Sequence, residues 1–226
     1  MRNFLLASLF LSLVAAVAVV PASADSVVYS SGPLHGQTDA WQINDANPVS
    51  DTFSFTGPYN WTITGATFAV WLNPGDALSS VKWSIGTSAY GSDVASGTVS
   101  PTANTGFANG YGEEVYTESF SSLDMHLTAG TYYFTLQGAQ VKNGNVINHD
   151  PAYWDENDGT SLGFSPATSP QTSIGAWDCA NAYGCGLTGG ETFGLDGFYA
   201  PEPSSFMLLG SGLVGLAGML KRKLNA

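Results

Sequence analysis

Short runs of alternating apolar and polar residues cover the middle of the chain. The runs are rich in β-branched and aromatic residues, and Gly, Pro, Asn and Asp separate them at short intervals. This pattern is typical of antiparallel β structure, and no stretch between the two ends of the chain shows convincing helical periodicity. We therefore predict an all-β domain with strands at 27–30, 50–55, 62–72, 81–85, 94–99, 113–120, 123–127, 131–136, 152–155 and 192–199.

The run 62–72 is apolar on both of its faces. Phe68 and Val70 fall on one face and Trp71 on the other. Because successive side chains of a strand point to opposite sides, we expect this strand to be buried on both sides. The sequence 73–76, Asn-Pro-Gly-Asp, then predicts a turn, since proline presets the φ of the second turn position and glycine tolerates a positive φ at the third.

The runs 123–127 and 131–136 are expected to face each other across the short connection 128–130. Such a pair is typical of β-sandwich edges, where a tyrosine early in the second strand hydrogen-bonds back over the corner. We predict two packed antiparallel sheets, a jelly-roll-like sandwich, with a closed barrel as the alternative. Six tryptophans provide ample apolar mass for the core, at positions 41, 61, 71, 83, 154 and 177.

An export signal precedes the domain. Arg2 comes before the apolar run 4–20, and Ala22 and Ala24 supply the small side chains that a signal peptidase accepts at the −3 and −1 positions. The alternative is a transmembrane helix, which Pro21 and the Ala-Ser-Ala sequence disfavour. We therefore predict a signal peptide over 1–24 and a mature protein that begins at Asp25.

The C-terminal segment has three parts. Pro201-Glu202-Pro203 is followed by a nearly unbroken apolar run over 206–220, and the run ends at the basic triplet 221–223. The run is shorter than the roughly 20 residues that cross a bilayer comfortably. Because basic residues stay on the cytoplasmic side, everything before Pro201 is expected to face outward.

Pro201-Glu202-Pro203 and the glycine-rich run 210–218 resemble the PEP-CTERM sorting tail of Gram-negative, exopolysaccharide-producing bacteria. The resemblance covers about 26 of the 226 residues. It implies export through the inner membrane, transient anchoring through the C-terminal hydrophobic sorting helix, and processing near Pro201-Glu202-Pro203 by an exosortase, a transpeptidase-like membrane enzyme. It also implies delivery to the cell surface or extracellular matrix. The alternative is a single-pass anchor that is simply retained.

Tails of this type are also known as the C-terminal segment of ice-binding proteins. An ice-binding surface requires a flat Thr-x-Thr array, and Thr62-Ile63-Thr64 alone does not make one.

Removing both targeting ends leaves residues 25–200, the size of one domain, with 17 acidic and two basic side chains and hence a net charge of −15. Without cations to neutralise phosphates, the domain is expected to bind neither nucleic acid nor anionic lipid. Such a surface suits divalent cations or neutral extracellular polysaccharide. The alternative is that the charge only keeps an exported protein soluble.

Cys179 and Cys185 are the only cysteines, and both lie in the exported part. In an oxidising compartment we expect them to form a disulfide that closes a short local loop, worth about 2 kcal/mol. Two cysteines without a nearby histidine are too few ligands for a metal site.

An acidic stretch follows the run at 152–155. Asp155, Glu156 and Asp158 place three carboxylates within four positions, and clustered oxygens of this kind can bind Ca²⁺. The spacing is not that of an EF-hand. The alternative is an ordinary acidic turn.

The same region contains aromatic side chains that could hold a sugar ring. Tyr153, Trp154 and Trp177 lie beside hydrogen-bonding oxygens, so these residues are candidates for a glycan-binding surface. Glycan binding would depend on calcium if the acidic stretch binds Ca²⁺. Aromatic residues in such loops more often cover the core.

Catalytic signals are weak. Glu114 and Glu118 would share one face of a strand, whereas a glycosidase requires two carboxylates about 5–10 Å apart across a cleft. The three histidines are scattered, and neither a nucleophile elbow nor a phosphate-binding glycine loop is present. We therefore expect no enzymatic activity but a structural or binding role in the cell envelope or extracellular polysaccharide matrix. A secreted carbohydrate-active enzyme is the alternative.

Overall fold

The computed structural model describes residues 26–32, 34, 36, 39–44, 48–104, 106–157, 174–175 and 190–200, and the single positions 210, 212, 213, 217 and 221. The strands are β1 (Ser26–Ser30), β2 (Asp39–Gln42), β3 (Val49–Phe55), β4 (Asn60–Leu72), β5 (Asp76–Gly86), β6 (Ala95–Val99), β7 (Thr102–Ala103), β8 (Phe107–Ala108), β9 (Glu114–Leu127), β10 (Gly130–Asn143), β11 (Val146–Asn148), β12 (Ala152–Asn157), β13 (Ile174–Gly175), β14 (Gly190–Glu191) and β15 (Phe193–Ala200).

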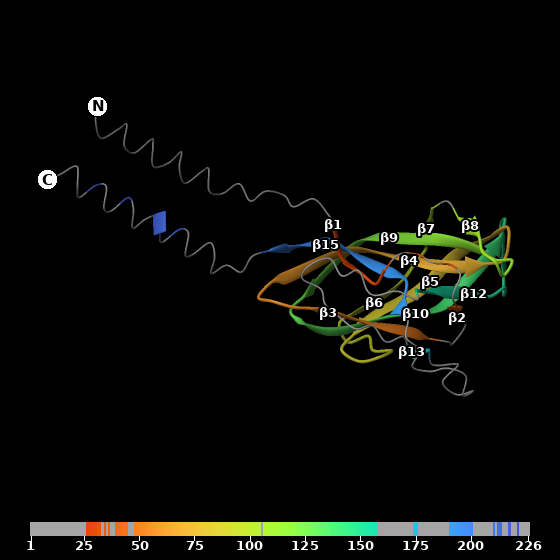
Figure 1. Ribbon diagram of the computed structural model, residues 1–226, viewed down its shortest axis with the longest axis horizontal. Helices are drawn as coiled ribbons and strands as arrows, with labels where there is room; N and C mark the ends of the chain where they lie inside the picture. The colour runs from red at the N-terminus through yellow and green to blue at the C-terminus, as the bar shows by residue number, and fades with distance from the viewer. Residues whose placement is uncertain are drawn as a thin grey trace, which may run out of the picture.

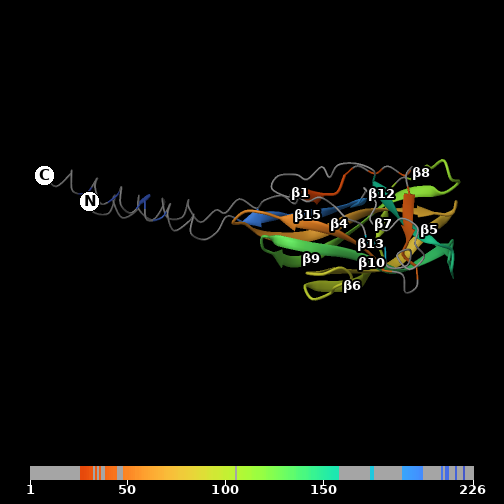
Figure 2. The same ribbon diagram turned by 60° about the horizontal axis from the view of Figure 1, so that its bottom comes forward.

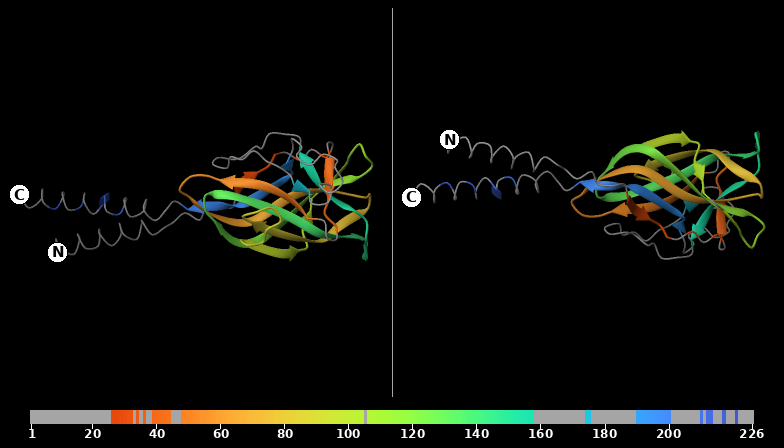
Figure 3. Two further views of the ribbon diagram at one scale, coloured as in Figure 1. Left: turned by 90° about the horizontal axis from the view of Figure 1, so that it is seen from below. Right: turned by 90° about the horizontal axis from the view of Figure 1, so that it is seen from above.

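These strands form two antiparallel sheets, which confirms the all-β prediction (Figure 1). The larger sheet has the order β1-β15-β4-β12-β14, with β9 on the other edge of β4, β7 and β8 on β9, and β2 on β12. The smaller sheet has the order β13-β3-β10-β5-β6, with β11 on β10. Figure 3 shows the sheets from opposite sides. The jelly-roll arrangement stays a prediction.

Strand β4 is the centre of the larger sheet. One edge pairs with β9, and the other pairs first with β15 and then with β12. Val70 and Trp71 are both buried although they point to opposite sides, so the expected two-sided burial is confirmed. The predicted turn follows at once: Gly75 has a φ of 85°, and Asp76 N donates to Asn73 O at 3.0 Å.

The core lies between the two sheets. The fully buried Phe134 of the smaller sheet meets Phe193 and Trp154 of the larger one, with ring centroids 5.2 and 5.6 Å apart. Trp83 and Ile85, which share one face of β5, are buried as well.

The chain changes sheets between β9 and β10. Strand β9 hydrogen-bonds to β4 in the larger sheet, and β10 to β3 and β5 in the smaller one, so the two strands face each other across the core. At this corner Tyr132 Oη donates to Thr128 O at 3.2 Å. The tyrosine expected to bond back over the corner is therefore confirmed.

We call one end of the domain the tail end, because β15 finishes there at Ala200. Ala200 pairs with Asn60, and Gly130 pairs with Phe55. The turn 56–59, between Phe55 and Asn60, and the connection 128–129, just before Gly130, therefore lie at this end. The opposite, distal end carries the turns 73–75 and 144–145, because Asn143 pairs with Asp76. Figure 2 shows β15 reaching the tail end beside the start of β4.

Several predicted features lie outside the described residues: the signal peptide with Ala22 and Ala24, the disulfide Cys179–Cys185, Pro201-Glu202-Pro203, Asp158 and Trp177. They stay predictions. The described C-terminal positions 210, 212, 213, 217 and 221 are helical. Within the part of the chain that the structure describes, no helix has the length and apolar character needed to cross a membrane.

Candidate functional site

Asp155 joins three parts of the larger sheet. Its Oδ1 accepts hydrogen bonds from Trp71 Nε1 at 2.6 Å and from the backbone N of Gly36 at 2.9 Å, and its Oδ2 accepts one from Thr192 Oγ1 at 2.8 Å. The carboxylate is fully buried. Asp155 therefore acts as a structural tie, with both oxygens occupied by protein donors that a calcium ion would have to displace.

Trp154 and Tyr153 lie on β12, on opposite faces of the larger sheet. Trp154 is fully buried in the core, and its Nε1 donates to Thr192 O at 3.0 Å. Its ring is thus a core element and is not on the surface where a sugar would contact it. Tyr153 is half-buried, and burial, followed by the negative charge of Glu113, raises its pKa.

A group of buried acids connects the two sheets. Asp51 of β3 accepts a hydrogen bond from the backbone N of Glu191 at 2.8 Å, and Glu191 pairs with Glu156 across β14 and β12. Glu156 accepts a hydrogen bond from Trp41 Nε1 at 3.3 Å. Burial, together with the smaller effect of the Glu156 charge, raises the pKa of Asp51 to about 8 against the opposing effect of its backbone donors Thr52 and Glu191. Asp51 is therefore largely protonated at neutral pH.

Within the described residues, no group of three or more His, Cys, Asp and Glu side chains is arranged to hold a metal ion. Asp158 is not among them, so calcium binding by Asp155, Glu156 and Asp158 stays a prediction.

Glu118 of β9 is a further buried acid, on another strand of the larger sheet. Its side chain is 1% exposed and lies on the same face of the strand as Phe120 of the core. Neither carboxyl oxygen has a hydrogen-bond partner among the described residues. Burial raises the pKa of Glu118 to about 7.

Glu114 occupies the same face of β9 but a different environment. Tyr116 Oη donates to Glu114 Oε2, which also receives the backbone N of Gly75 at 3.5 Å. Glu114 and Glu118 are four residues apart on an extended strand, which separates their Cα atoms by about 13 Å. Neither residue lines the two cavities described next.

A polar cavity of about 430 Å³ opens beside β7 and β9. The apolar residues Val99 and Phe120 line part of it. The rest of the lining is four hydroxyl side chains and one carboxylate, from Ser100, Thr102, Ser119, Ser121 and Asp196. Asp196 of β15 reaches this cavity past Gly65 of β4, which pairs with Asp196 on one side and Ser121 on the other. A side chain at Gly65 would bring its Cβ to 2.8 Å from the backbone O of Phe120.

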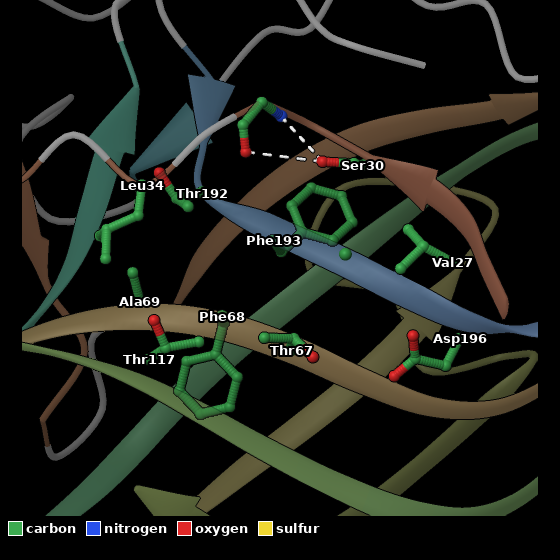
Figure 4. Close-up of a pocket in the computed structure, with 12 residues that line it drawn as sticks. Val27, Ser30, Leu34, Thr67, Phe68, Ala69, Thr117, Thr192, Phe193 and Asp196 are labelled. Atoms are coloured by element: carbon green, nitrogen blue, oxygen red, sulfur yellow. Dashed lines mark hydrogen bonds between the residues drawn. The ribbon is translucent and has the colours of Figure 1, made fainter. Parts of the chain in front are cut away.

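Asp196 also lines a second cavity, of about 210 Å³, on the outer face of the larger sheet (Figure 4). Thr67 and Thr117 form part of its floor, and Leu34 and Val27 stand at its sides. Ser30 Oγ accepts the backbone N–H of Gly32 at 3.3 Å, where the chain leaves β1. The two cavities thus meet at one carboxylate.

We call these two cavities together the outer groove. Sequence reasoning missed it, because its residues come from six strands, β1, β4, β6, β7, β9 and β15, which are spread along the whole domain. The only available signal was the outward alternation of Ser and Thr along 113–120, which does not reveal neighbouring strands.

Chemically, the outer groove offers donors and acceptors next to apolar surface. Serine and threonine hydroxyls both donate and accept, whereas Asp196 accepts. Among the described residues, no basic side chain lines the groove. Such a lining fits a neutral ligand with many hydroxyl groups better than an anion.

Comparison with known proteins identifies the C-terminal segment. The PEP-CTERM protein-sorting motif matches residues 200–223, which confirms the resemblance noted on Pro201-Glu202-Pro203. No curated protein matches the chain. The motif begins at Ala200, the last residue of β15, so the sorting segment follows the sheet without an intervening element.

Proposed function

We propose that the chain is an exported, exosortase-sorted protein whose β-domain has a binding role in the cell envelope or extracellular polysaccharide matrix. The sorting motif at residues 200–223 carries this proposal, since it implies an exosortase-targeted exported protein. The closed core and the outer groove support a binding role for the domain, because they combine a stable scaffold with an accessible polar surface.

Mature protein recovered from the envelope or the medium is expected to lack both apolar ends. Intact-mass analysis should show Asp25 as the first residue and a C-terminus within residues 201–205. Replacing Pro201-Glu202-Pro203 by three alanines should leave signal-peptide removal unchanged and abolish the second cleavage. Recovery of wild-type protein that still carries residues 206–220 would argue against exosortase processing.

The outer groove is the proposed binding surface for neutral polysaccharide. Its hydroxyl groups complement sugar hydroxyls, and the apolar side chains of Val99 and Phe120 complement the C–H surface of a sugar ring. The domain's charge of −15 acts against anionic polymers at the same surface.

Removing two groove hydroxyls should weaken glycan binding about 30-fold, since each lost hydrogen bond is worth about 1 kcal/mol and the two together about 2 kcal/mol. The test compares a Thr102→Val, Ser119→Ala variant with the wild type in titrations with a neutral glucan and a neutral galactomannan. Ser54→Ala, Thr131→Val is the matched control, because Ser54 and Thr131 form an exposed hydroxyl pair, 2.9 Å apart, on the smaller sheet. Equal affinities of the two variants would exclude the groove, and preferential binding of alginate would exclude a neutral ligand.

A further inference from the structure

A series of aromatic rings in contact runs from the core to the surface at the tail end. Phe55 stacks on the buried Trp61 with a centroid distance of 4.7 Å. Trp61 contacts Tyr59 at 6.2 Å and Tyr199 at 5.2 Å, and these two tyrosines are 5.2 Å apart. Tyr199 is 51% exposed, and Tyr59 is half-buried. The domain thus presents two tyrosine rings on a rigid support at the end where the sorting motif begins.

The turns around these rings carry no charge. The turn 56–59 reads Thr-Gly-Pro-Tyr and the connection 128–129 reads Thr-Ala, and both are exposed apart from Tyr59. The first ionisable pair back along β9 is Asp124 with His126, whose carboxylate and ring nitrogen are 3.7 Å apart.

Charged side chains from both sheets lie at the distal end instead. Asp76 opens β5 beside the distal turn 73–75, and burial, with the charge of Asp76, raises the pKa of the neighbouring Glu113. The basic Lys142 pairs with Ala77 at the same end. In its described residues the domain is therefore polarised, with aromatic rings and uncharged turns at the tail end and acidic side chains at the distal end.

Chain length limits how far the tail end can stand from a membrane. Five residues, 201–205, separate Ala200 from the first residue of the apolar run, Phe206. A fully extended chain of this length spans about 20 Å. The polar layer of a bilayer is about 5–8 Å thick on each side. While the apolar run is held in the membrane, the end of β15 can therefore lie no more than about 15 Å beyond the lipid–water interface.

We propose that the tail end of the domain, centred on Tyr59 and Tyr199, docks on the lipid–water interface of the membrane that holds the C-terminal run before processing. Tyrosine suits this region because its ring is apolar and its hydroxyl can remain hydrated. The uncharged turns can approach the headgroups without the cost of moving ions out of water. Docking rests on the proposed sorting function and would hold Pro201-Glu202-Pro203 at the membrane surface, where a membrane enzyme can reach it.

The partner surface is a zwitterionic interface, because the tail end has no lysine or arginine in its described residues that could attract anionic lipid. Binding at this end should therefore depend little on salt or on the fraction of anionic lipid.

The test uses the full chain, unprocessed and reconstituted into phosphatidylcholine vesicles, with amide hydrogen exchange as the readout. Amides of the turns 56–59 and 128–129 are expected to exchange about tenfold more slowly than those of the distal turn 144–145. A Tyr59→Ser, Tyr199→Ser variant should lose this protection, whereas Tyr59→Phe, Tyr199→Phe should keep most of it. The matched control is Val146→Ser, Ile147→Ser, which removes two exposed apolar side chains, 68% and 58% exposed, from the distal end.

Amides in the middle of β4 report whether a variant is folded, since this strand is paired on both edges. For variants with unchanged β4 exchange, protection of the tail-end turns that survives in the double serine variant would overturn the docking proposal. Exchange of these turns as fast as that of 144–145 in the wild type would overturn it too. Failure of the full chain to enter vesicles would overturn both docking and the proposed sorting function. If serine substitution also unfolds β4, the deciding measurement is the quenching of tryptophan fluorescence by brominated lipids, made on protein that keeps both tyrosines. Quenching must be weaker in a Trp61→Phe variant than in the wild type, and it must be unchanged in a Trp83→Phe variant.

Discussion

Replacing Asp155 by alanine is expected to lower the free energy of unfolding by about 3–5 kcal/mol, because it leaves three buried hydrogen-bond donors without an acceptor and each unsatisfied donor costs about 1–3 kcal/mol. The donors left behind would be Trp71 Nε1, Thr192 Oγ1 and the backbone N of Gly36, which reach Asp155 from different parts of the chain. Each was desolvated on folding and would have no replacement acceptor. The loss is thus larger than that of an ordinary polar contact.

Urea unfolding followed by circular dichroism measures this loss directly. Asp150→Ala is the matched control: it removes a part-buried carboxylate just before the same strand, and its Oδ2 accepts a side-chain bond at 2.6 Å from Asn148, two residues away. The control is expected to cost about 1 kcal/mol. Similar losses in the two variants would show that Asp155 does not tie the sheet together.

Replacing Glu118 by methionine is expected to stabilise the protein at alkaline pH. The buried carboxyl has no hydrogen-bond partner among the described residues, and burial raises its pKa to about 7 from the ordinary 4.5. This difference corresponds to about 3 kcal/mol. Methionine has a similar length and no charge to desolvate. For a domain of this size the melting temperature at pH 8.5 should rise by about 6–12 °C.

The direction of the pH effect follows from proton binding. Because the folded state holds the Glu118 proton more tightly than the unfolded chain, its contribution to stability is complete below pH 4.5 and is lost as pH rises through about 7. Asp51 acts in the same direction, with a folded pKa of about 8 against 3.8. The wild type should therefore be more stable at pH 5 than at pH 8.5, and the Glu118→Met variant should show a smaller decrease.

Calorimetry at pH 5 and 8.5 separates this effect from a general change in net charge. Asp124→Asn on the same strand also removes one negative charge, but the side chain of Asp124 is 87% exposed. This variant should therefore lose as much stability between pH 5 and pH 8.5 as the wild type does. A Glu118→Met protein that loses as much stability as the wild type between these two pH values would show that Glu118 is not the group responsible.

Local sequence identified most of the long strands and the sorting motif of this protein. It was wrong to divide 113–120 from 123–127, which form the single strand β9, and it missed β2 and β11. Alternation along 62–72 and the Pro74-Gly75 turn predicted β4 and its end correctly, because side-chain direction and turn φ depend on adjacent residues. The sorting motif was recognisable for the same reason, since it is contiguous and is matched at 200–223. Tyr132 at the sheet-to-sheet corner also bonds only four residues back.

Tertiary structure alone decided the roles of the acids and the location of the groove. Asp155 appeared in the sequence as a member of an acidic turn, yet its hydrogen-bond donors lie 119, 84 and 37 residues away. Glu114 and Glu118 looked equivalent, yet one is bonded to Tyr116 and the other is buried without a partner among the described residues. Asp196 meets Ser121 only because Gly65 lies between them in the register. Strand neighbours, and therefore burial and pKa, are set by long-range pairing, which a two-residue alternation does not encode.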